Sequence, residues 1–244
     1  MDPQIATFQS FITHSDATPE ENTNAFGETR KVDRYFTREP GPYGFLVTMP
    51  RRNVINPHFH HVDQFQLFYG SPGANYKGAE IAPDQLLLHY ADAYSTYGPI
   101  HSGEQPLEFF TLRARLDRGI GYIPKDRDRL VRTSRHRNIY RDHPLAPGPD
   151  TPALDVIIEP DADGIAAYRL RGQPGEIMSP PSAAGTGGQY CLLVNGAVTY
   201  QDRQYGPRSL AWIGPDTPAP SLVADPDRGA DLIVMQFPKP PNAS

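Results

Sequence analysis

One stretch decides how the chain is interpreted: residues 57–70, which read PHFHHVDQFQLFYG. Three of the eight histidines fall within four positions here, and the segment then reads as a β-strand that stops at Gly70. Side chains alternate between the two faces of a strand, so His58 and His60 share a face with Gln64 while His61 points the other way. A His-x-His pair with an oxygen donor four residues further on is how a β-barrel presents ligands to a metal ion.

Bulk properties limit the class of protein. The chain has 244 residues and a net charge of −5, which gives no reason to expect nucleic acid or an anionic membrane as partner. No signal peptide is visible and no apolar run approaches the roughly 20 residues that span a bilayer, so we expect a soluble cytoplasmic protein. The single cysteine, Cys191, lies among apolar residues and is expected to be a buried thiol.

Short β-type runs separated by turn residues recur along the chain, and helical periodicity is scarce. The dipeptide Asn195-Gly196 predicts a β-hairpin with a type I′ turn. Two β-rich halves of similar length suggest an internal duplication. The runs that we expect to form strands are 44–49, 64–69, 85–90, 107–114, 154–158, 166–170, 189–194, 197–200, 209–213 and 232–237.

The positions of the turn-forming and linker residues predict three regions along the chain. Residues 1–40 are polar and are expected to form an N-terminal arm. Residues 41–145 would form a first barrel, together with a connecting segment over 113–143 in which arginines and aspartates interleave as on a solvated surface. A Pro- and Gly-rich linker then leads to a second barrel over 146–244.

The first half resembles the cupin family, whose members are small antiparallel jelly-roll barrels. The first cupin motif runs His-x-His, three or four residues, Glu, about six residues, Gly; this chain has His58 and His60, then Gln64, then Gly70. The second motif ends with a histidine, three residues and then an asparagine. Those two positions fall on Tyr97 and His101, so the third histidine of the family is missing from its usual place.

The second half resembles a cupin as well. Residues 189–196 fit the later part of the first motif with Gln189 in the Glu place, but residues 179–183 stand where His-x-His would be, and no histidine follows His143. The resemblance therefore implies an all-β bicupin, two jelly-roll barrels in one chain, with at most one metal centre, in the first half. The second barrel would be structural, and a homodimer interface is one role open to it.

The resemblance implies one divalent transition metal (Fe, Mn, Ni, Zn or Cu) on His58 and His60, with Gln64 and His101 as further ligands. Without a carboxylate ligand, the metal would keep its full charge and favour an anionic substrate. Tyr97 and His101 are the candidate acid–base residues. The residues expected around the substrate are Gln66, His89, Tyr94 and Tyr97.

Three functions remain open on the sequence. The first is a metal-dependent enzyme, a mononuclear non-heme dioxygenase or other oxygenase acting on a small aromatic or enolic substrate. The second is a non-redox isomerase, cyclase or lyase. The third is a metal-free bicupin that binds a small molecule, in which His58 and His60 are ordinary hydrogen-bonding barrel residues; His89 reads equally as a core histidine. The fold does not choose among them.

Overall fold

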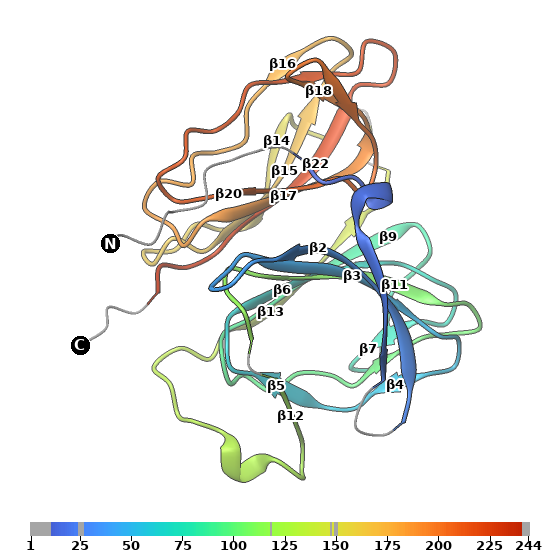
Figure 1. Cartoon of the computed structure of the whole chain (residues 1–244). Helices are drawn as coiled ribbons and strands as arrows, with labels where there is room; N and C mark the ends of the chain where they lie inside the picture. The colour runs from blue at the N-terminus through green and yellow to red at the C-terminus, as the bar shows by residue number, and fades with distance from the viewer. Residues whose placement is uncertain (1–10, 24–26, 118, 147, 149–150, 241–244) are drawn as a thin grey trace. The chain divides into compact units, whose positions relative to one another are not determined.

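The computed structural model describes residues 11–23, 27–117, 119–146, 148 and 151–240 (Figure 1). The chain divides into two compact units. We call Ala17–Ala146 the first barrel, and Met1–Asp16 together with Pro147–Ser244 the second barrel. The described residues contain antiparallel strands and two 3-10 turns, His14–Asp16 and Arg127–Arg129, and no α-helix. The all-β fold class with two jelly-roll barrels is confirmed.

The first barrel has two layers that face each other (Figure 1). A seven-stranded sheet has the order β1-β2-β3-β11-β6-β9-β13, and the opposite layer consists of a four-stranded sheet, β4-β10-β7-β8, and the pair β12-β5. The strands are β1 Thr18–Thr23, β2 Thr29–Thr37, β3 Tyr43–Met49, β4 Val54–Ile55, β5 His58–His60, β6 Gln64–Tyr69, β7 Asn75–Tyr76, β8 Ala79–Glu80, β9 Gln85–Ala91, β10 Ile100–His101, β11 Leu107–Arg113, β12 Ile120–Tyr122 and β13 Asn138–Pro144.

Alternation along the strands builds the core of the first barrel. Every second residue of β3 and β11, such as Val47 and Phe109, faces inward and packs against the opposite layer. Ile55, Tyr76 and Ile100 supply that layer's apolar side chains. This cluster fills one part of the barrel, and the polar cavity described below occupies another.

The second barrel repeats this topology. Its five-stranded sheet has the order β14-β15-β22-β17-β20, which corresponds to β2-β3-β11-β6-β9, and its four-stranded sheet, β16-β21-β18-β19, corresponds to β4-β10-β7-β8. The repeated order supports the internal duplication. The strands are β14 Leu154–Ile158, β15 Ala166–Gly172, β16 Ile177–Met178, β17 Gln189–Gly196, β18 Val198–Tyr200, β19 Arg203–Tyr205, β20 Leu210–Ile213, β21 Leu222–Ala224 and β22 Ala230–Gln236.

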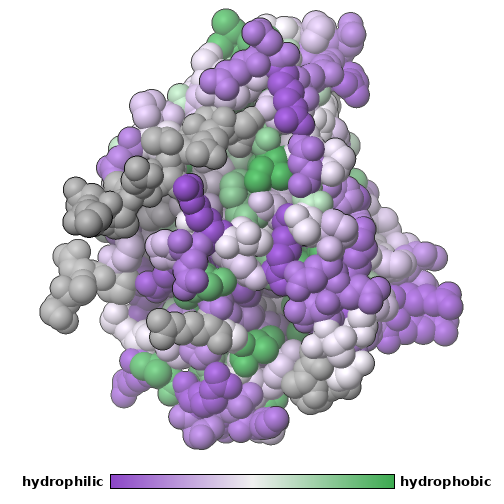
Figure 2. All heavy atoms as spheres, viewed as in Figure 1, coloured by the Kyte–Doolittle hydropathy of each residue, from purple (hydrophilic) through white to green (hydrophobic). Residues whose placement is uncertain are grey.

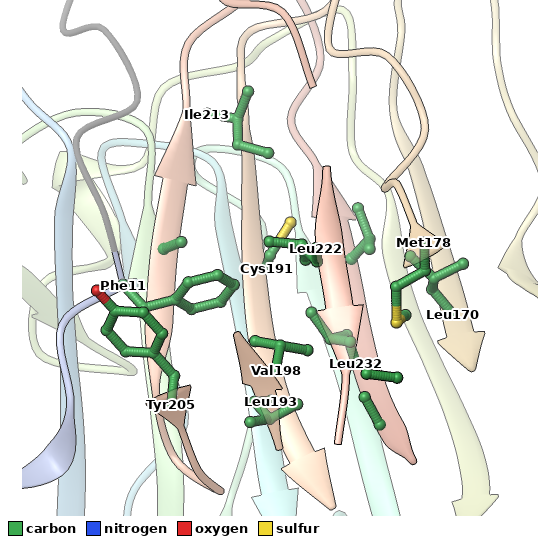
Figure 3. Packing of buried hydrophobic residues seen from close by; sticks show 14 of the residues in the cluster. Phe11, Leu170, Met178, Cys191, Leu193, Val198, Tyr205, Ile213, Leu222 and Leu232 are labelled. Carbon is green, nitrogen blue, oxygen red and sulfur yellow. The ribbon is translucent and has the colours of Figure 1, made fainter. Parts of the chain in front are cut away.

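Apolar side chains fill the inside of the second barrel (Figure 3). Cys191 lies among them with 1% of its surface exposed, and burial raises the pKa of its thiol, so the thiol stays protonated. Phe11 packs in the same cluster with its ring 5.3 Å from that of Tyr205, and Ile12 forms a β-bridge with Leu210. The first described residues of the chain therefore complete the second barrel.

Two strands of the first barrel lie within residues 1–40, the region expected to form an N-terminal arm. Residues 18–23 and 29–37 form β1 and β2, which pair with each other, and β2 also pairs with β3. All six side chains of β1 are exposed, so the strand is held by backbone pairing and leaves no apolar pattern in the sequence. Residues 1–10 lie outside the described residues.

The predicted hairpin at Asn195-Gly196 was also wrong. The chain passes there from β17 into β18, which belongs to the other sheet, and the β17–β22 register shifts between Leu193 and Asn195. A type I′ turn needs two successive residues with positive φ, and only Gly196 has one, +68°. A Cβ at Gly196 would lie 2.1 Å from the carbonyl oxygen of Gly229, so glycine serves a tight corner between the two sheets.

The face of the molecule in Figure 2 is mostly hydrophilic, with small separate apolar patches. Such patches are normal for a protein surface. None of the described helical segments is long and apolar enough to cross a membrane.

Candidate functional site

A cavity of about 390 Å³ lies inside the first barrel, a volume suited to a small organic ligand. Its lining residues come from strands β1 to β6, β11 and β12 and from the segment between β11 and β12. Its polar residues include His58, His60, Gln64 and Gln66, and its apolar wall includes Phe45 and Phe109. The structure therefore brings the His-x-His pair and both glutamines of the opening stretch to one cavity.

The histidines and glutamines reach the cavity from two separate strands. β5 carries His58 and His60 and pairs with β12, whereas β6 carries Gln64 and Gln66 and lies between β11 and β9. The two strands are joined by residues 61–63, which are not in a strand. The single continuous strand expected from the sequence is thus broken, yet each half still turns its alternate residues inward.

Each imidazole has one nitrogen held by an oxygen acceptor. Nδ1 of His58 lies 2.8 Å from the carbonyl oxygen of Asn56, and Nδ1 of His60 lies 2.5 Å from Oδ2 of Asp117. Carbonyl and carboxylate oxygens only accept, so Nδ1 carries the proton in both rings and Nε2 keeps its lone pair. This tautomer is the one that a metal-binding histidine with an oxygen partner adopts.

Burial lowers the pKa of both imidazoles. The pKa of His58 lies well below its usual range because the ring is buried and His60 is adjacent. The pKa of His60 is lowered to about 4 by burial and by the charge of Arg113, against the opposing effect of Asp117. Both rings are therefore neutral at pH 7, which is the state that coordinates a metal.

Gln64 is fixed at both ends of its amide. Oε1 accepts a hydrogen bond from Nε of Arg113 at 2.8 Å, and Nε2 donates to the hydroxyl of Tyr97 at 2.5 Å. The amide oxygen has a second lone pair, which can still reach a ligand. Burial raises the pKa of Tyr97, so its hydroxyl remains protonated behind the glutamine and is not among the groups lining the cavity.

Arg113 and Asp117 form an ion pair beside His60, with Nη1 of Arg113 3.6 Å from Oδ2 of Asp117. Burial would raise the pKa of Asp117, but the hydrogen bond with His60 and the charge of Arg113 hold it at about 2. Nη2 of Arg113 lies 3.2 and 3.3 Å from the two nitrogens of His60. If Nη2 lay in the plane of the ring at these two distances, it would overlap Cε1, the carbon between the two nitrogens. Nη2 therefore lies over the face of the ring, away from the direction of the Nε2 lone pair.

These residues fit a transition metal. Two neutral imidazoles and one amide line the same cavity, and the acceptors Asn56 and Asp117 orient the rings. The described residues include no group of three His, Cys, Asp or Glu side chains that could hold a metal, so the amide of Gln64 is needed as the third donor.

The structure does not bring His101 to this cavity. His101 follows Ile100 on β10, and Ile100 is fully buried in the apolar cluster, so alternation turns His101 away from the barrel interior. Tyr94 also lies elsewhere: its ring is 5.4 Å from that of His61, and neither residue lines the cavity. His101, the expected third imidazole, and Tyr94, an expected wall residue, are therefore not among the residues that line the cavity.

His89 is a fully buried partner of the cavity wall. Its Nδ1 lies 2.9 Å from Oε1 of Gln66, and its Nε2 lies 2.9 Å from Oδ1 of Asn138 and 3.0 Å from the Tyr76 hydroxyl. Its ring centroid is 4.7 Å from that of Tyr97. His89 thus fixes Gln66 from behind, in agreement with the interpretation as a hydrogen-bonded core histidine.

His89 predicts a specific dependence of stability on pH. Burial lowers its pKa from 6.5 to about 3, so its stabilising contribution is complete above pH 6.5 and is lost as the pH falls toward 3. His89→Gln keeps a hydrogen-bonding side chain that does not titrate. We expect the stability advantage of the wild type over this variant to shrink by about 1.4 kcal/mol per pH unit below pH 6.5.

The measurement is urea unfolding of both proteins at pH 7.5, 6.0 and 5.0 with a chelator present. His58 and His60 titrate in both proteins and cancel in the difference. A difference that stays constant over this range would contradict the prediction.

Several cavity residues were not identified from the sequence: Arg30, Arg34, Tyr43, Phe45, Arg113, Asp117 and Tyr122. Arg113 and Asp117 were assigned to a solvated connecting segment, but Asp117 has only 2% of its side chain exposed and Arg113 8%. One feature of the sequence indicates that Arg113 faces the cavity. Arg113 ends a strand whose alternate residues Phe109 and Thr111 face inward, so the same period directs Arg113 inward.

No family model matches this sequence, and a search of curated proteins finds no significant match. Solved structures do match. A "putative dioxygenase" from Nostoc punctiforme has a TM-score of 0.67 at 12% identity over 97% of this chain and 85% of its own. Oxalate decarboxylase from Bacillus subtilis has a TM-score of 0.58 at 9% identity, covering 97% and 78%. The pirin YhhW from Escherichia coli, in complex with nickel(II), has a TM-score of 0.52 at 12% identity, covering 94% and 98%.

At these identities the likeness shows the fold. The two barrels have the jelly-roll fold that the resemblance of the motif around His58 and His60 implied. One polypeptide carries both of them, which is the two-barrel architecture expected from the sequence.

Proposed function

We propose that the first barrel holds one divalent transition metal through Nε2 of His58, Nε2 of His60 and Oε1 of Gln64, and acts as an enzyme on a small anionic organic substrate. One observation carries this proposal: each imidazole gives its Nδ1 proton to a fixed oxygen acceptor and so directs a free Nε2 lone pair away from it. A satisfied core histidine needs no such arrangement on two neighbouring rings lining one cavity.

The surrounding residues suit an oxygenase acting on an aromatic or enolic substrate. A bound metal would supply Lewis-acid and redox chemistry. Arg113 supplies a fixed positive charge next to His60 that stabilises an anionic oxygen of the substrate. The rings of Tyr43, Phe45 and Tyr122 give the cavity flat walls for a planar ligand. The similarity to a "putative dioxygenase" supports this reaction class.

A metal-free or non-redox site is the second candidate, because a guanidinium already lies at the centre of the site. Arg113 donates to Gln64 and covers the face of His60, so it supplies a permanent cation without a metal. In this case the barrel would bind an anion, or act on it as an isomerase, cyclase or lyase.

Element analysis of protein purified without a histidine tag tests the proposal. We expect close to one transition metal per chain, and oxygen consumption during turnover would identify the oxygenase among the metal-dependent options. Protein that contains no metal, and takes up none when Fe(II), Mn(II), Ni(II), Zn(II) and Cu(II) are offered separately, would overturn the proposal in favour of the second candidate.

The ion pair beside His60 predicts opposite effects of its two members. Asp117→Asn removes the carboxylate that orients His60 and strengthens it as a donor, so metal affinity should fall by about 10- to 100-fold. Arg113→Met removes a positive charge next to the ligands, so metal affinity should rise.

Competition with a chromogenic chelator measures both affinities. Asp128→Asn, an exposed aspartate of the 3-10 turn Arg127–Arg129, is the matched control and should leave the affinity unchanged. A change in the same direction for both members of the pair would show that electrostatics at His60 does not control the site.

A further inference from the structure

The lining of the cavity is positively charged. The charged side chains that line it are those of Arg30, Arg34, Arg113 and Asp117, whereas Glu20 and Glu28, which pair with Arg34 and Arg30, are not part of the lining. His58 and His60 add none at pH 7, because burial lowers the pKa of both rings. Three of the four charged side chains that face the cavity are therefore cations, which favours an anionic ligand there.

Two of the three guanidinium groups already have close partners. Arg34 pairs with Glu20 and with the hydroxyl of Tyr43. Arg113 donates to Gln64 and lies beside Asp117. The guanidinium groups of Arg34 and Arg113 therefore already bind other side chains of the cavity wall or its surroundings.

Arg30 differs from these two. Its side chain is 14% exposed, its only described ion pair is with Glu28 at a long 3.4 Å, and Glu28 is itself 31% exposed. Nε of Arg30 is buried and has no hydrogen-bond partner among the described residues. A buried donor without a partner is costly, so this group is the one that gains most from an added acceptor.

The strand register places Arg30 away from the Arg113 end of the wall. Arg113 lies opposite Tyr43, the next inward row contains Arg34, and the row after that is apolar, with Val32 opposite Val47 and Val47 opposite Phe109. Arg30 lies two residues before Val32 on β2 and therefore faces inward in the next row. The apolar row of Val32, Val47 and Phe109 separates it from the end of the cavity wall that contains Arg113. Arg30 and His58 line the same cavity.

We propose that Arg30 anchors the carboxylate of the substrate, which is a small organic acid with a compact apolar body. The carboxylate pairs with the guanidinium of Arg30, the body lies along Val32, Val47 and Phe109, and the opposite end of the molecule reaches His58 and His60. This inference deepens the proposed function and rests on it for the reacting end; the carboxylate contact itself is independent of the metal.

Isothermal titration calorimetry tests the anchor on protein as purified, with metal content measured on the same samples. The probes are benzoate, phenylacetate and 3-phenylpropanoate, with benzamide as the neutral counterpart of benzoate. We expect at least one of the acids to bind and benzamide to bind far more weakly. Arg30→Met should weaken acid binding by about 10- to 100-fold, the usual cost of losing a hydrogen-bonded charge partner.

Two further variants make the result specific. Arg30→Lys keeps the charge without the planar fork and should bind the acids with intermediate affinity. Arg132→Met removes an exposed arginine outside the cavity and should change nothing. Thermal unfolding of each variant verifies that it is folded.

The outcomes separate this inference from the proposed function. Failure of all three acids to bind, equal binding of benzamide and benzoate, or equal affinities of Arg30→Met and wild type would each overturn the anchor. Arg30-dependent binding to protein that takes up no metal would keep the anchor and overturn the metal site. Full metal content with binding that ignores Arg30 would keep the metal site and overturn the anchor.

Discussion

Protein in which both His58 and His60 are replaced by alanine is expected to bind no transition metal. These two rings supply the only imidazole nitrogens of the described cavity wall; the amides of Gln64 and Gln66 are weak ligands for such ions, and the carboxylate of Asp117 is paired with Arg113. Element analysis after incubation with excess metal and gel filtration gives the result directly. Both positions are buried or half-buried in β5, so the secondary structure of the variant must be verified by circular dichroism.

His101→Ala is the informative control for this experiment. The cupin resemblance made His101 a candidate third ligand, whereas the structure turns it away from the barrel interior on β10. We expect His101→Ala to keep its full metal content. Loss of metal in this variant would mean that His101 reaches the site after all, and unchanged metal in the double variant would rule out the site.

Arg169→Met should destabilise the protein by about 3–5 kcal/mol, the usual cost of leaving one member of a buried ion pair without its partner. Arg169 is 1% exposed and binds Asp231 with both arms of its guanidinium, at 2.9 and 2.6 Å. Methionine preserves much of the volume but leaves the buried carboxylate of Asp231 without its cation, with the Nδ2 of Asn195 at 3.4 Å as a weak partner. Urea unfolding at pH 7 measures the change.

The double variant Arg169→Met with Asp231→Leu should recover most of the loss, because removing both charges also removes the cost of burying them. Arg203→Met is the matched control in the same barrel. Arg203 pairs with Asp16 at 2.7 Å, but both side chains are about half exposed, so its loss should cost no more than about 1 kcal/mol. Equal effects of Arg169→Met and Arg203→Met would contradict the distinction between a buried and an exposed pair.

Strands with a regular apolar pattern could be predicted from the sequence. The runs at 64–69 and 154–158 match β6 and β14, because short runs rich in strand-forming residues between turn residues define a strand locally. β1 could not be predicted in this way, because its exposed polar side chains carry no period. Its strand conformation comes from pairing with β2.

The candidate site was predictable only in part. The spacing of His58, His60 and Gln64 is a local property, and the structure places all three around one cavity. Arg30 and Arg113 lie more than 80 residues apart in the sequence and line the same cavity because β2 and β11 both flank β3. No local pattern contains that neighbour relation. The orientation of His101 could not be predicted locally either, because it depends on how Ile100 packs in the core.

The pairing of Ile12 with Leu210 and the packing of Phe11 against Tyr205 bear on how this polypeptide can be cut or assembled. During synthesis, Phe11 and Ile12 emerge nearly 200 residues before Leu210, the residue with which Ile12 pairs. The first barrel, Ala17–Ala146, can fold before that partner has been made. A fragment that starts at Pro147 would lack the phenylalanine that fills its interior and would expose apolar surface there. Producing the second barrel by itself therefore requires residues 11–16 to be grafted back, for example by circular permutation.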